Sequence, residues 1–261
     1  MSVESRRPEG RSVIGSALGR GMIRAGHFFF RFRDLLFPLV FLALIAGTRA
    51  RWPWGRRDLE IASNGLALLL MVSGQLLRAL VIGFAYVRRG GKNRQIFAES
   101  LVVEGFFAHS RNPLYLGNLL GLLGLLVLHD SPLGYAVGIP FFAFAYAAII
   151  AAEEDYLVRR FGSVYDQYCR RVPRLLPSFA GLRQTLADMR FDWRRLVRKE
   201  YGTTFAGVTA VCALLVWDDY QRLGSAEAGQ AARVLLWVWV PAAAAYLTAR
   251  WLKKRGSLGT G

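Results

Sequence analysis

Cysteine is scarce in this chain of 261 residues, which contains only Cys169 and Cys212. Two cysteines cannot build a disulfide framework, and neither lies at a spacing typical of a zinc site. The sequence therefore argues against a disulfide-rich secreted domain and predicts no metal centre. Because no histidine near Cys169 would activate it as a nucleophile, an ordinary surface thiol is the favoured interpretation of this residue.

Charge is absent from long segments of the chain, and 54% of the residues are hydrophobic. Such a composition is typical of a polytopic membrane protein. Several of the uncharged runs are short for a bilayer crossing, which takes about 20 residues, so their flanks must contribute. The sequence predicts an all-α integral membrane bundle of about six transmembrane helices, from uncharged runs at residues 35–48, 61–77, 112–128, 131–152, 202–217 and 234–249.

Acidic residues are also few, with 18 Asp and Glu against 34 Lys and Arg, and the net charge is +16. If the N-terminus lies in the cytosol, 27 of the 34 basic residues fall on the cytosolic side, as the positive-inside tendency requires. Attraction to anionic lipid headgroups then explains the excess charge. We expect a multi-pass protein with both termini in the cytosol that contacts membrane lipids and binds no nucleic acid.

The chain divides into three predicted parts. Residues 1–33 form a basic N-terminal segment that is partly disordered, over about 1–21, or interfacial. Residues 34–180 form the membrane core, and residues 181–261 form a basic connector and two additional transmembrane helices. We expect the last two helices to be structural, with homo-oligomerisation as one role. Arg78, within the second predicted transmembrane helix, either reaches the membrane surface with its long side chain or anchors a site.

Two adjacent carboxylates, Glu153 and Glu154, end the uncharged run of residues 131–152. Charge at the membrane boundary is costly and usually has a partner. The two apolar runs at 112–128 and 131–152 are joined only by a short turn at residues 129–132, so their other ends must lie on the same side of the membrane. We therefore expect Arg111 to lie close to Glu153 and Glu154. A structural ion pair that ties two helix ends together is the alternative.

The pattern becomes amphipathic from Glu153 to about Arg171. Pro173 and Pro177 end this predicted helix. It either rests on the membrane surface or closes a pocket over the two preceding helices, and its apolar face carries Leu157, Phe161, Val164, Tyr165 and Tyr168.

Three glycines, Gly117, Gly121 and Gly124, share one face of the third apolar run. Close helix packing is one interpretation of this spacing. Room for a ligand against the bare backbone is the other, and the two are compatible.

Two strings of residues resemble the signature of the isoprenylcysteine carboxyl methyltransferases and the related phospholipid methyltransferases. The first string runs from Gly105 to Asn118 and contains Arg111-Asn112-Pro113-Leu114-Tyr115-Leu116-Gly117. The second contains Glu153-Glu154, Phe161-Gly162, Tyr165, Tyr168, Val172-Pro173-Arg174 and Pro177. The two strings occur in the order of the family signature, and the resemblance covers roughly residues 80–180.

This resemblance implies S-adenosylmethionine as the cofactor, bound in a cytosol-facing pocket, and a lipid-like acceptor that enters from the bilayer. Arg111 and Glu154 would be the catalytic residues, and Tyr165, Tyr168 and Arg174 would contact the acceptor. The implied cofactor-binding residues are Gly105, His109, Arg111, Asn112, Pro113, Tyr115, Leu116, Gly117, Asn118, Glu153 and Glu154.

The chain departs from the family signature at Asn112, where a histidine is usual. Asparagine can hydrogen-bond to a cofactor but cannot exchange a proton near neutral pH, and His109 is a candidate substitute. The same strings also resemble membrane sterol reductases that use NADPH. A reductase and a non-catalytic membrane protein therefore remain as alternatives to a methyltransferase.

Overall fold

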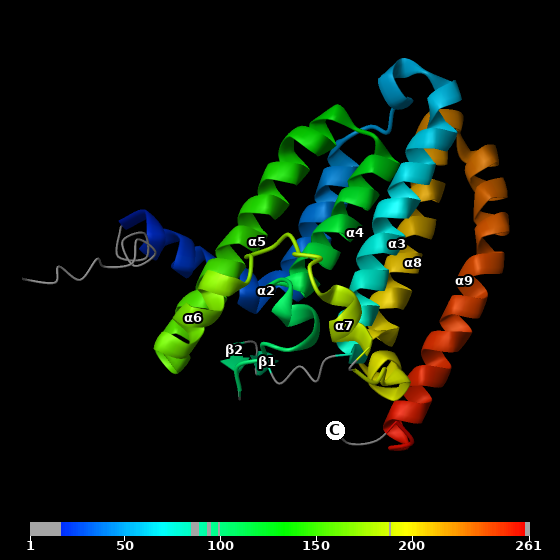
Figure 1. Ribbon diagram of the computed structural model, residues 1–261. Helices are drawn as coiled ribbons and strands as arrows, with labels where there is room; N and C mark the ends of the chain where they lie inside the picture. The colour runs from blue at the N-terminus through cyan, green and yellow to red at the C-terminus, as the bar shows by residue number, and fades with distance from the viewer. Residues whose placement is uncertain (1–16, 85–88, 93–94, 99, 188, 259–261) are drawn as a thin grey trace, which may run out of the picture.

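The computed structural model describes residues 17–84, 89–92, 95–98, 100–187 and 189–258. Within these ranges the chain is helical apart from one short antiparallel hairpin (Figure 1). The disorder predicted for the first 16 residues lies outside the described residues. Residues 17–21, which were also expected to be disordered, instead begin the first described helix.

Six long helices and two short ones make up the described fold. The pair β1 (Arg89–Lys92) and β2 (Gln95–Ala98) forms the antiparallel hairpin. The long helices are α2 (Ala17–Gly47), α3 (Glu60–Phe84), α4 (Pro113–His129), α5 (Pro132–Phe161), α8 (Trp193–Leu223) and α9 (Ser225–Lys254). The short ones are α6 (Ser163–Arg171) and α7 (Leu182–Ala187), with 3-10 turns at Pro53–Gly55, Arg57–Leu59 and η3 (Gly105–Ala108).

Four of these helices are long and apolar enough to cross a membrane, which confirms a multi-pass membrane protein. They are Arg57–Phe84, Pro132–Phe161, Trp193–Leu223 and Ser225–Lys254. Helix α4 is apolar but has only 17 residues, and the uncharged part of α2 begins only after Asp34. The expected total of six spans therefore stays a prediction.

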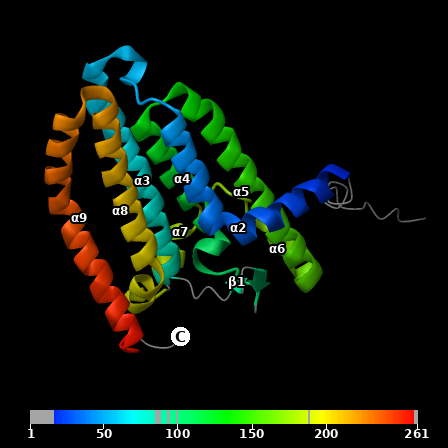
Figure 2. The same ribbon diagram turned by 180° about the vertical axis from the view of Figure 1, so that it is seen from behind.

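The long helices pack in pairs, α2 against α5, α3 against α4 and α8 against α9. Helix α8 also contacts α3 and α4, so the C-terminal pair is attached to the bundle through α8 (Figures 1 and 2). We call the end of the bundle that carries the α4–α5 connection the turn end, and the opposite end the α6 end. The short helices α6 and α7 and the β hairpin all gather at the α6 end (Figure 1).

The α4–α5 connection is the tight turn that the sequence predicted. Asp130 has a φ of 48°, in the left-handed region, and caps the end of α4. The Ser131 hydroxyl then accepts a hydrogen bond from the Gly134 N–H and caps the start of α5. Because α4 and α5 reverse direction here, the start of α4 and the end of α5 both lie at the α6 end.

Glycines allow α3 and α4 to approach closely. A Cβ on Gly117 would lie 2.7 Å from Cγ of Arg78 and 2.8 Å from the Gly74 carbonyl oxygen, and one on Gly124 would lie 2.5 Å from Cγ of Met71. The predicted close packing is therefore confirmed at Gly117 and Gly124. At Gly121 a Cβ would meet nothing within 4 Å.

The single amphipathic helix predicted from Glu153 to Arg171 is wrong in one respect, because α5 continues to Phe161 and a break follows. Gly162 has a φ of 53°, a conformation that glycine adopts readily. The chain then restarts as α6, with Tyr165 and Tyr168 buried and Val164 exposed. Val164 therefore does not share the buried face on which the sequence placed it.

A buried polar cluster closes the turn end of the bundle. The ring of His129 lies 2.8 Å from the Thr48 hydroxyl through Nε2 and 2.8 Å from Oδ1 of Asp218 through Nδ1. Thr48 directly follows α2, His129 is the last residue of α4 and Asp218 lies in α8. The cluster therefore joins three helices where their apolar packing ends.

Candidate functional site

The two strings that carry the family resemblance bind each other directly. The Arg111 N–H donates to the Pro173 carbonyl at 2.9 Å, and the Ser178 N–H donates to the His109 carbonyl at 2.9 Å. The side chains add to this pairing, because the Asn112 amide donates to the Arg174 carbonyl at 2.9 Å. The segment before α4 and the segment after α6 therefore form one unit at the α6 end.

Arg111 and Glu154 lie together, as the sequence predicted. Nη1 of Arg111 is 3.2 Å from Oε1 of Glu154, and Nη2 of Arg174 is 2.9 Å from the other carboxylate oxygen, Oε2. The Arg111 and Glu154 side chains are only 15% and 16% exposed. Two guanidinium groups thus share one carboxylate, so these three residues carry a net positive charge.

Helix α6 adds a tyrosine and a thiol to this cluster. Nη1 of Arg111 lies 2.6 Å from Sγ of Cys169. Burial raises the pKa of Tyr165, and the nearby Glu154 raises it further. Burial alone lowers the pKa of Arg111, but the attraction of Glu154, Cys169 and Tyr165 outweighs this, so the pKa of Arg111 is raised. The guanidinium therefore stays charged and the phenol neutral at physiological pH.

Cys169 is half-buried beside Arg111, so the surface thiol expected from the sequence is wrong. Burial raises the pKa of its thiol despite the opposing effect of Arg111. A raised pKa lowers the thiolate fraction at a given pH, and the thiolate is the reactive form.

We expect iodoacetamide to alkylate the Cys169 thiol more slowly than it alkylates the thiol of free glutathione at pH 7.5. The rate of alkylation at Cys169 should rise above pH 9. Mass spectrometry would measure this, with Cys169→Ser reporting any reaction at Cys212. A rate equal to that of glutathione would contradict the prediction.

Glu153 does not join Glu154 but faces a different set of partners. Its Oε1 accepts a 2.7 Å hydrogen bond from the Tyr115 hydroxyl, which in turn accepts one from Nη1 of Arg33 at 3.2 Å. Consecutive residues on a helix point about 100° apart, which explains this separation. The two carboxylates therefore serve two neighbouring clusters.

Asn118 and Gly117 lie one turn further along α4, away from Arg111. Oδ1 of Asn118 accepts a hydrogen bond from Arg78, whose guanidinium also binds Glu200 of α8. The surface-reaching interpretation of Arg78 is therefore wrong. The expectation that α8 is only a structural span is incomplete, because α8 brings a carboxylate to this group.

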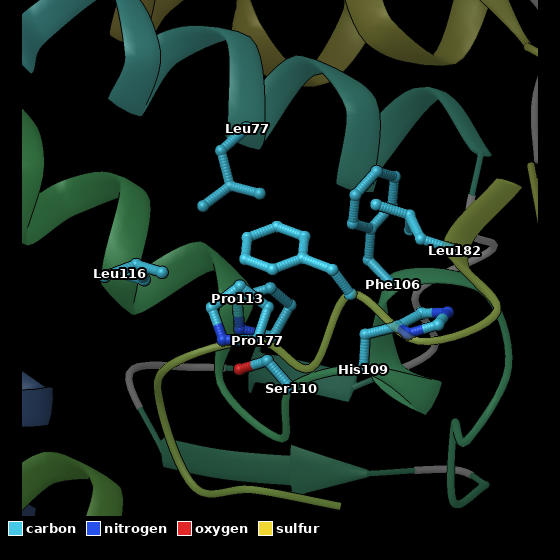
Figure 3. A pocket seen from close by; sticks show the side chains of 9 residues that line it. Leu77, Phe106, His109, Ser110, Pro113, Leu116, Pro177 and Leu182 are labelled. Carbon is cyan, nitrogen blue, oxygen red and sulfur yellow. The ribbon is translucent and has the colours of Figure 1, made fainter.

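A small cavity of about 40 Å³ is lined by residues of α3, η3, the start of α4 and the segment from Pro177 to Leu182, and none of Arg111, Glu154 and Arg174 lines it. Figure 3 shows its lining, in which Leu77 from α3 faces Pro113 and Leu116 from α4, with Phe106 from η3 and Pro177 and Leu182 from the later segment. His109 also lines the cavity. Its ring is held by the Ser178 carbonyl at Nδ1 (2.8 Å) and by the Thr185 hydroxyl at Nε2 (3.0 Å).

The remaining predicted site residues lie around this unit. Gly105 begins η3 with a φ of 63°, and the Tyr168 hydroxyl donates to the Phe107 carbonyl at 2.6 Å. Tyr168 therefore fastens α6 to the segment that precedes α4.

Comparison with known proteins gives a family for this part of the chain. The model of the phospholipid methyltransferase family matches residues 63–164. Residues 63–164 belong to the phospholipid methyltransferase family. This region contains most of α3 and all of α4 and α5, and with them Arg111, Tyr115, Asn118, Glu153 and Glu154.

Curated relatives are distant and partial. The chain is 36% identical over 115 residues to the cobalt-zinc-cadmium resistance protein CzcN of Cupriavidus metallidurans, covering 44% of this chain and 48% of that protein. It is 30% identical over 146 residues to the nickel-cobalt-cadmium resistance protein NccN of Alcaligenes xylosoxydans xylosoxydans, covering 56% and 62%. It is 31% identical over 120 residues to the protein-S-isoprenylcysteine O-methyltransferase of Schizosaccharomyces pombe, covering 42% and 48%. The chain thus spans from about half to 62% of the length of these relatives. No solved structure matches.

Two charged residues outside the phospholipid methyltransferase region were missed by sequence reasoning. Arg33 belongs to a run of alternating aromatic and basic residues in α2, a pattern that is equally typical of an interfacial helix. Glu200 lies in an Arg-rich stretch that resembles a cytosolic connector. Neither position carries a local signal, because both acquire their partners only through helix packing.

Proposed function

We propose that this protein transfers a methyl group from S-adenosylmethionine to a lipophilic acceptor at the membrane–cytosol interface. Membership of residues 63–164 in the phospholipid methyltransferase family supports methyl transfer as the reaction class. The observation that carries the proposal is the largely buried pair of Arg111 and Glu154 with the half-exposed Arg174, which offers charges of both signs beside the ends of two apolar helices.

The residues present fit such a cofactor. Oε1 of Glu154 is buried and accepts no hydrogen bond within the described residues, although Arg111 is 3.2 Å away. A buried carboxylate oxygen without a hydrogen bond is costly and is satisfied when a ligand donates one. The cofactor's ammonium or ribose hydroxyls would supply that donor. Arg111 and Arg174 would hold a carboxylate of the cofactor or the acceptor.

Methyl transfer mainly requires the protein to position the two reactants. The bound cofactor supplies an electrophilic methyl group with a good leaving group. The chain must align the acceptor with it and exclude water. A carboxylate acceptor needs no base, whereas an amine must first lose a proton. Because both ring nitrogens of His109 are engaged, a carboxylate acceptor of the isoprenylcysteine type suits this site better.

Access to the site requires movement. A cavity of about 40 Å³ holds roughly one water molecule and is far too small for a nucleoside cofactor. The segment from Pro173 to Leu182 covers the cavity and is held by the hydrogen bonds to residues 109–112. In this proposal that segment moves outward to admit the cofactor, while Tyr165, Tyr168 and Arg174 contact the acceptor that arrives from the bilayer.

The proposal places the α6 end in the cytosol, with both termini on that side, because most Lys and Arg residues lie there. Helix α9 packs against α8 and exposes Val234, Leu236, Trp237 and Val238, a surface that suits lipid or a second copy of the chain. Homo-oligomerisation through α9 is part of the proposal.

Titration of the purified full chain with S-adenosylmethionine and, separately, with NADPH tests the reaction class. We expect the methyl donor to bind and NADPH not to bind. Incubation with lipid extracts and the methyl donor, followed by mass detection of the added methyl group, would then identify the acceptor. Binding of NADPH alone would favour a reductase, and binding of neither would favour a non-catalytic membrane protein.

A further inference from the structure

A largely buried arginine, Arg78, connects the three helices α3, α4 and α8. Arg78 of α3 binds Glu200 of α8 through two contacts, Nη2 to Oε1 at 2.6 Å and Nε to Oε2 at 2.9 Å. Its Nη1 donates to Oδ1 of Asn118 on α4. The Arg78 and Glu200 side chains are only 15% and 5% exposed. Such a bidentate, water-excluded pair has a defined geometry.

The methylene groups of the Arg78 side chain are as constrained as its guanidinium. A Cβ on Gly117 would lie 2.7 Å from Cγ of Arg78, so the stem runs directly over the α4 backbone. On the other side, Gln75 donates to Oε2 of Glu200 at 3.3 Å and to the Thr204 hydroxyl at 2.9 Å. The position of Arg78, and with it that of Asn118, is therefore fixed by α8.

A continuous chain of contacts runs from this ion pair to the candidate site. The Asn118 side chain lies beside the Tyr146 hydroxyl of α5. The ring of Tyr146 packs against that of Tyr115, with centroids 5.5 Å apart. Tyr115 in turn donates to Glu153 at 2.7 Å. Asn118 and Tyr115 both belong to the first two turns of α4, which follow Arg111 directly.

We propose that Glu200 is a positioning residue for the methyl-transfer site, acting through Arg78 and Asn118 on the first turns of α4. The inference rests on the proposed function and adds a role for the C-terminal pair α8–α9, which lies outside the family region of residues 63–164. Without the Glu200 carboxylate, the Arg78 charge is left unpaired in an apolar environment. The Arg78 guanidinium then interacts more strongly with its remaining acceptor, the Asn118 side-chain oxygen, and this change shifts α4.

The test compares Glu200→Gln with Lys199→Gln in the full chain in detergent. Lys199 is the preceding residue and is exposed, so it is a matched control for a change to glutamine on α8. Isothermal titration with S-adenosylmethionine reports the Kd of the folded molecules, while the stoichiometry reports how many are folded. We expect Glu200→Gln to raise the Kd by about tenfold, because small displacements of positioning groups have large effects. We expect no change for Lys199→Gln.

A double variant, Arg78→Met with Glu200→Gln, separates positioning from other roles. Methionine keeps an apolar stem over Gly117 and removes the unpaired charge. The amide oxygen of the glutamine introduced at position 200 can still accept the hydrogen bond that Gln75 donates there. We expect its Kd to return to within about threefold of the wild-type value, since an ion pair replaced by neutral groups is often tolerated.

Each outcome decides the question. A Glu200→Gln protein with wild-type Kd and reduced stoichiometry would show that the ion pair only holds the fold together. A double variant as impaired as Glu200→Gln would show that Glu200 does not act through Arg78. If the wild-type protein binds no S-adenosylmethionine, the proposed function fails and this role fails with it. A wild-type protein that binds while Glu200→Gln is unaffected overturns the positioning role alone.

Discussion

The variants Glu154→Gln and Arg111→Ala should each weaken binding of S-adenosylmethionine by about 30-fold or more. Both side chains are largely buried, and removing a group that pairs with a ligand charge in a buried site costs about 2–5 kcal/mol of binding free energy. Glutamine at position 154 cannot attract the cofactor's ammonium, and alanine at position 111 leaves its carboxylate without a forked donor. Isothermal titration of the full chain in detergent would measure both effects.

Loss of binding is informative only if both variants fold. In Arg111→Ala the Glu154 carboxylate keeps Arg174 at 2.9 Å, so no buried charge is left without a counterion. The midpoint temperature of thermal unfolding of Arg111→Ala should therefore stay close to that of the wild type. Asp166→Asn and Arg170→Ala on the exposed face of α6 are matched controls that change the same charges nearby. Normal binding in Glu154→Gln and Arg111→Ala would identify the cluster as a helix staple and not a binding site.

The proximity of Arg111 and Glu154 was predictable because it depends on connectivity alone. A turn as short as the one at Asp130 and Ser131 forces α4 and α5 to run antiparallel, which places their far ends together whatever their side chains are. The close packing at Gly117 and Gly124 was predictable for a similar reason, since glycines at helical spacing form one face.

Partners from distant helices could not be predicted. The pairing of Arg33 with Tyr115 and of Glu200 with Arg78 depends on how α2 and α8 are rotated about their axes against the bundle. No periodicity within either helix encodes that rotation. The break at Gly162 was visible in principle, because a glycine after an apolar run is a common helix end. The amphipathic pattern on either side of it concealed the signal.

The divergence of Glu153 and Glu154 changes how the site should be regarded. As adjacent residues they suggest a single acidic pair, yet one binds Arg111 and Arg174 and the other binds Tyr115. Helix α5 thus contributes one carboxylate to each of two clusters. Arg174 of the segment after α6 contacts the first cluster, and Arg33 of α2 contacts the second. Movement of the segment from Pro173 to Leu182 would release the first cluster and leave the second in place.

At the opposite end of the bundle, Asp218→Ala should lower the free energy of unfolding by about 3–5 kcal/mol, because it leaves the buried His129 ring without the group that shares a proton with it. Asp218 and His129 are 2% and 1% exposed, and their side chains lie 2.8 Å apart. Denaturation in detergent micelles, followed by circular dichroism, would measure the change. Asp219→Asn, one residue along α8, is the control and should have little effect.

The hydrogen bonds of His129 further predict which replacement of Asp218 destabilises the protein least. The Thr48 hydroxyl donates its proton to the Leu44 carbonyl at 2.6 Å, so Nε2 of His129 must donate to Thr48. A second proton must then lie between Nδ1 and the Asp218 carboxylate. Asparagine at position 218 can supply that proton from its amide to a neutral ring. Asp218→Asn should therefore cost much less than Asp218→Ala. Equal losses for the two would show that His129 is positively charged and needs the carboxylate as its counterion.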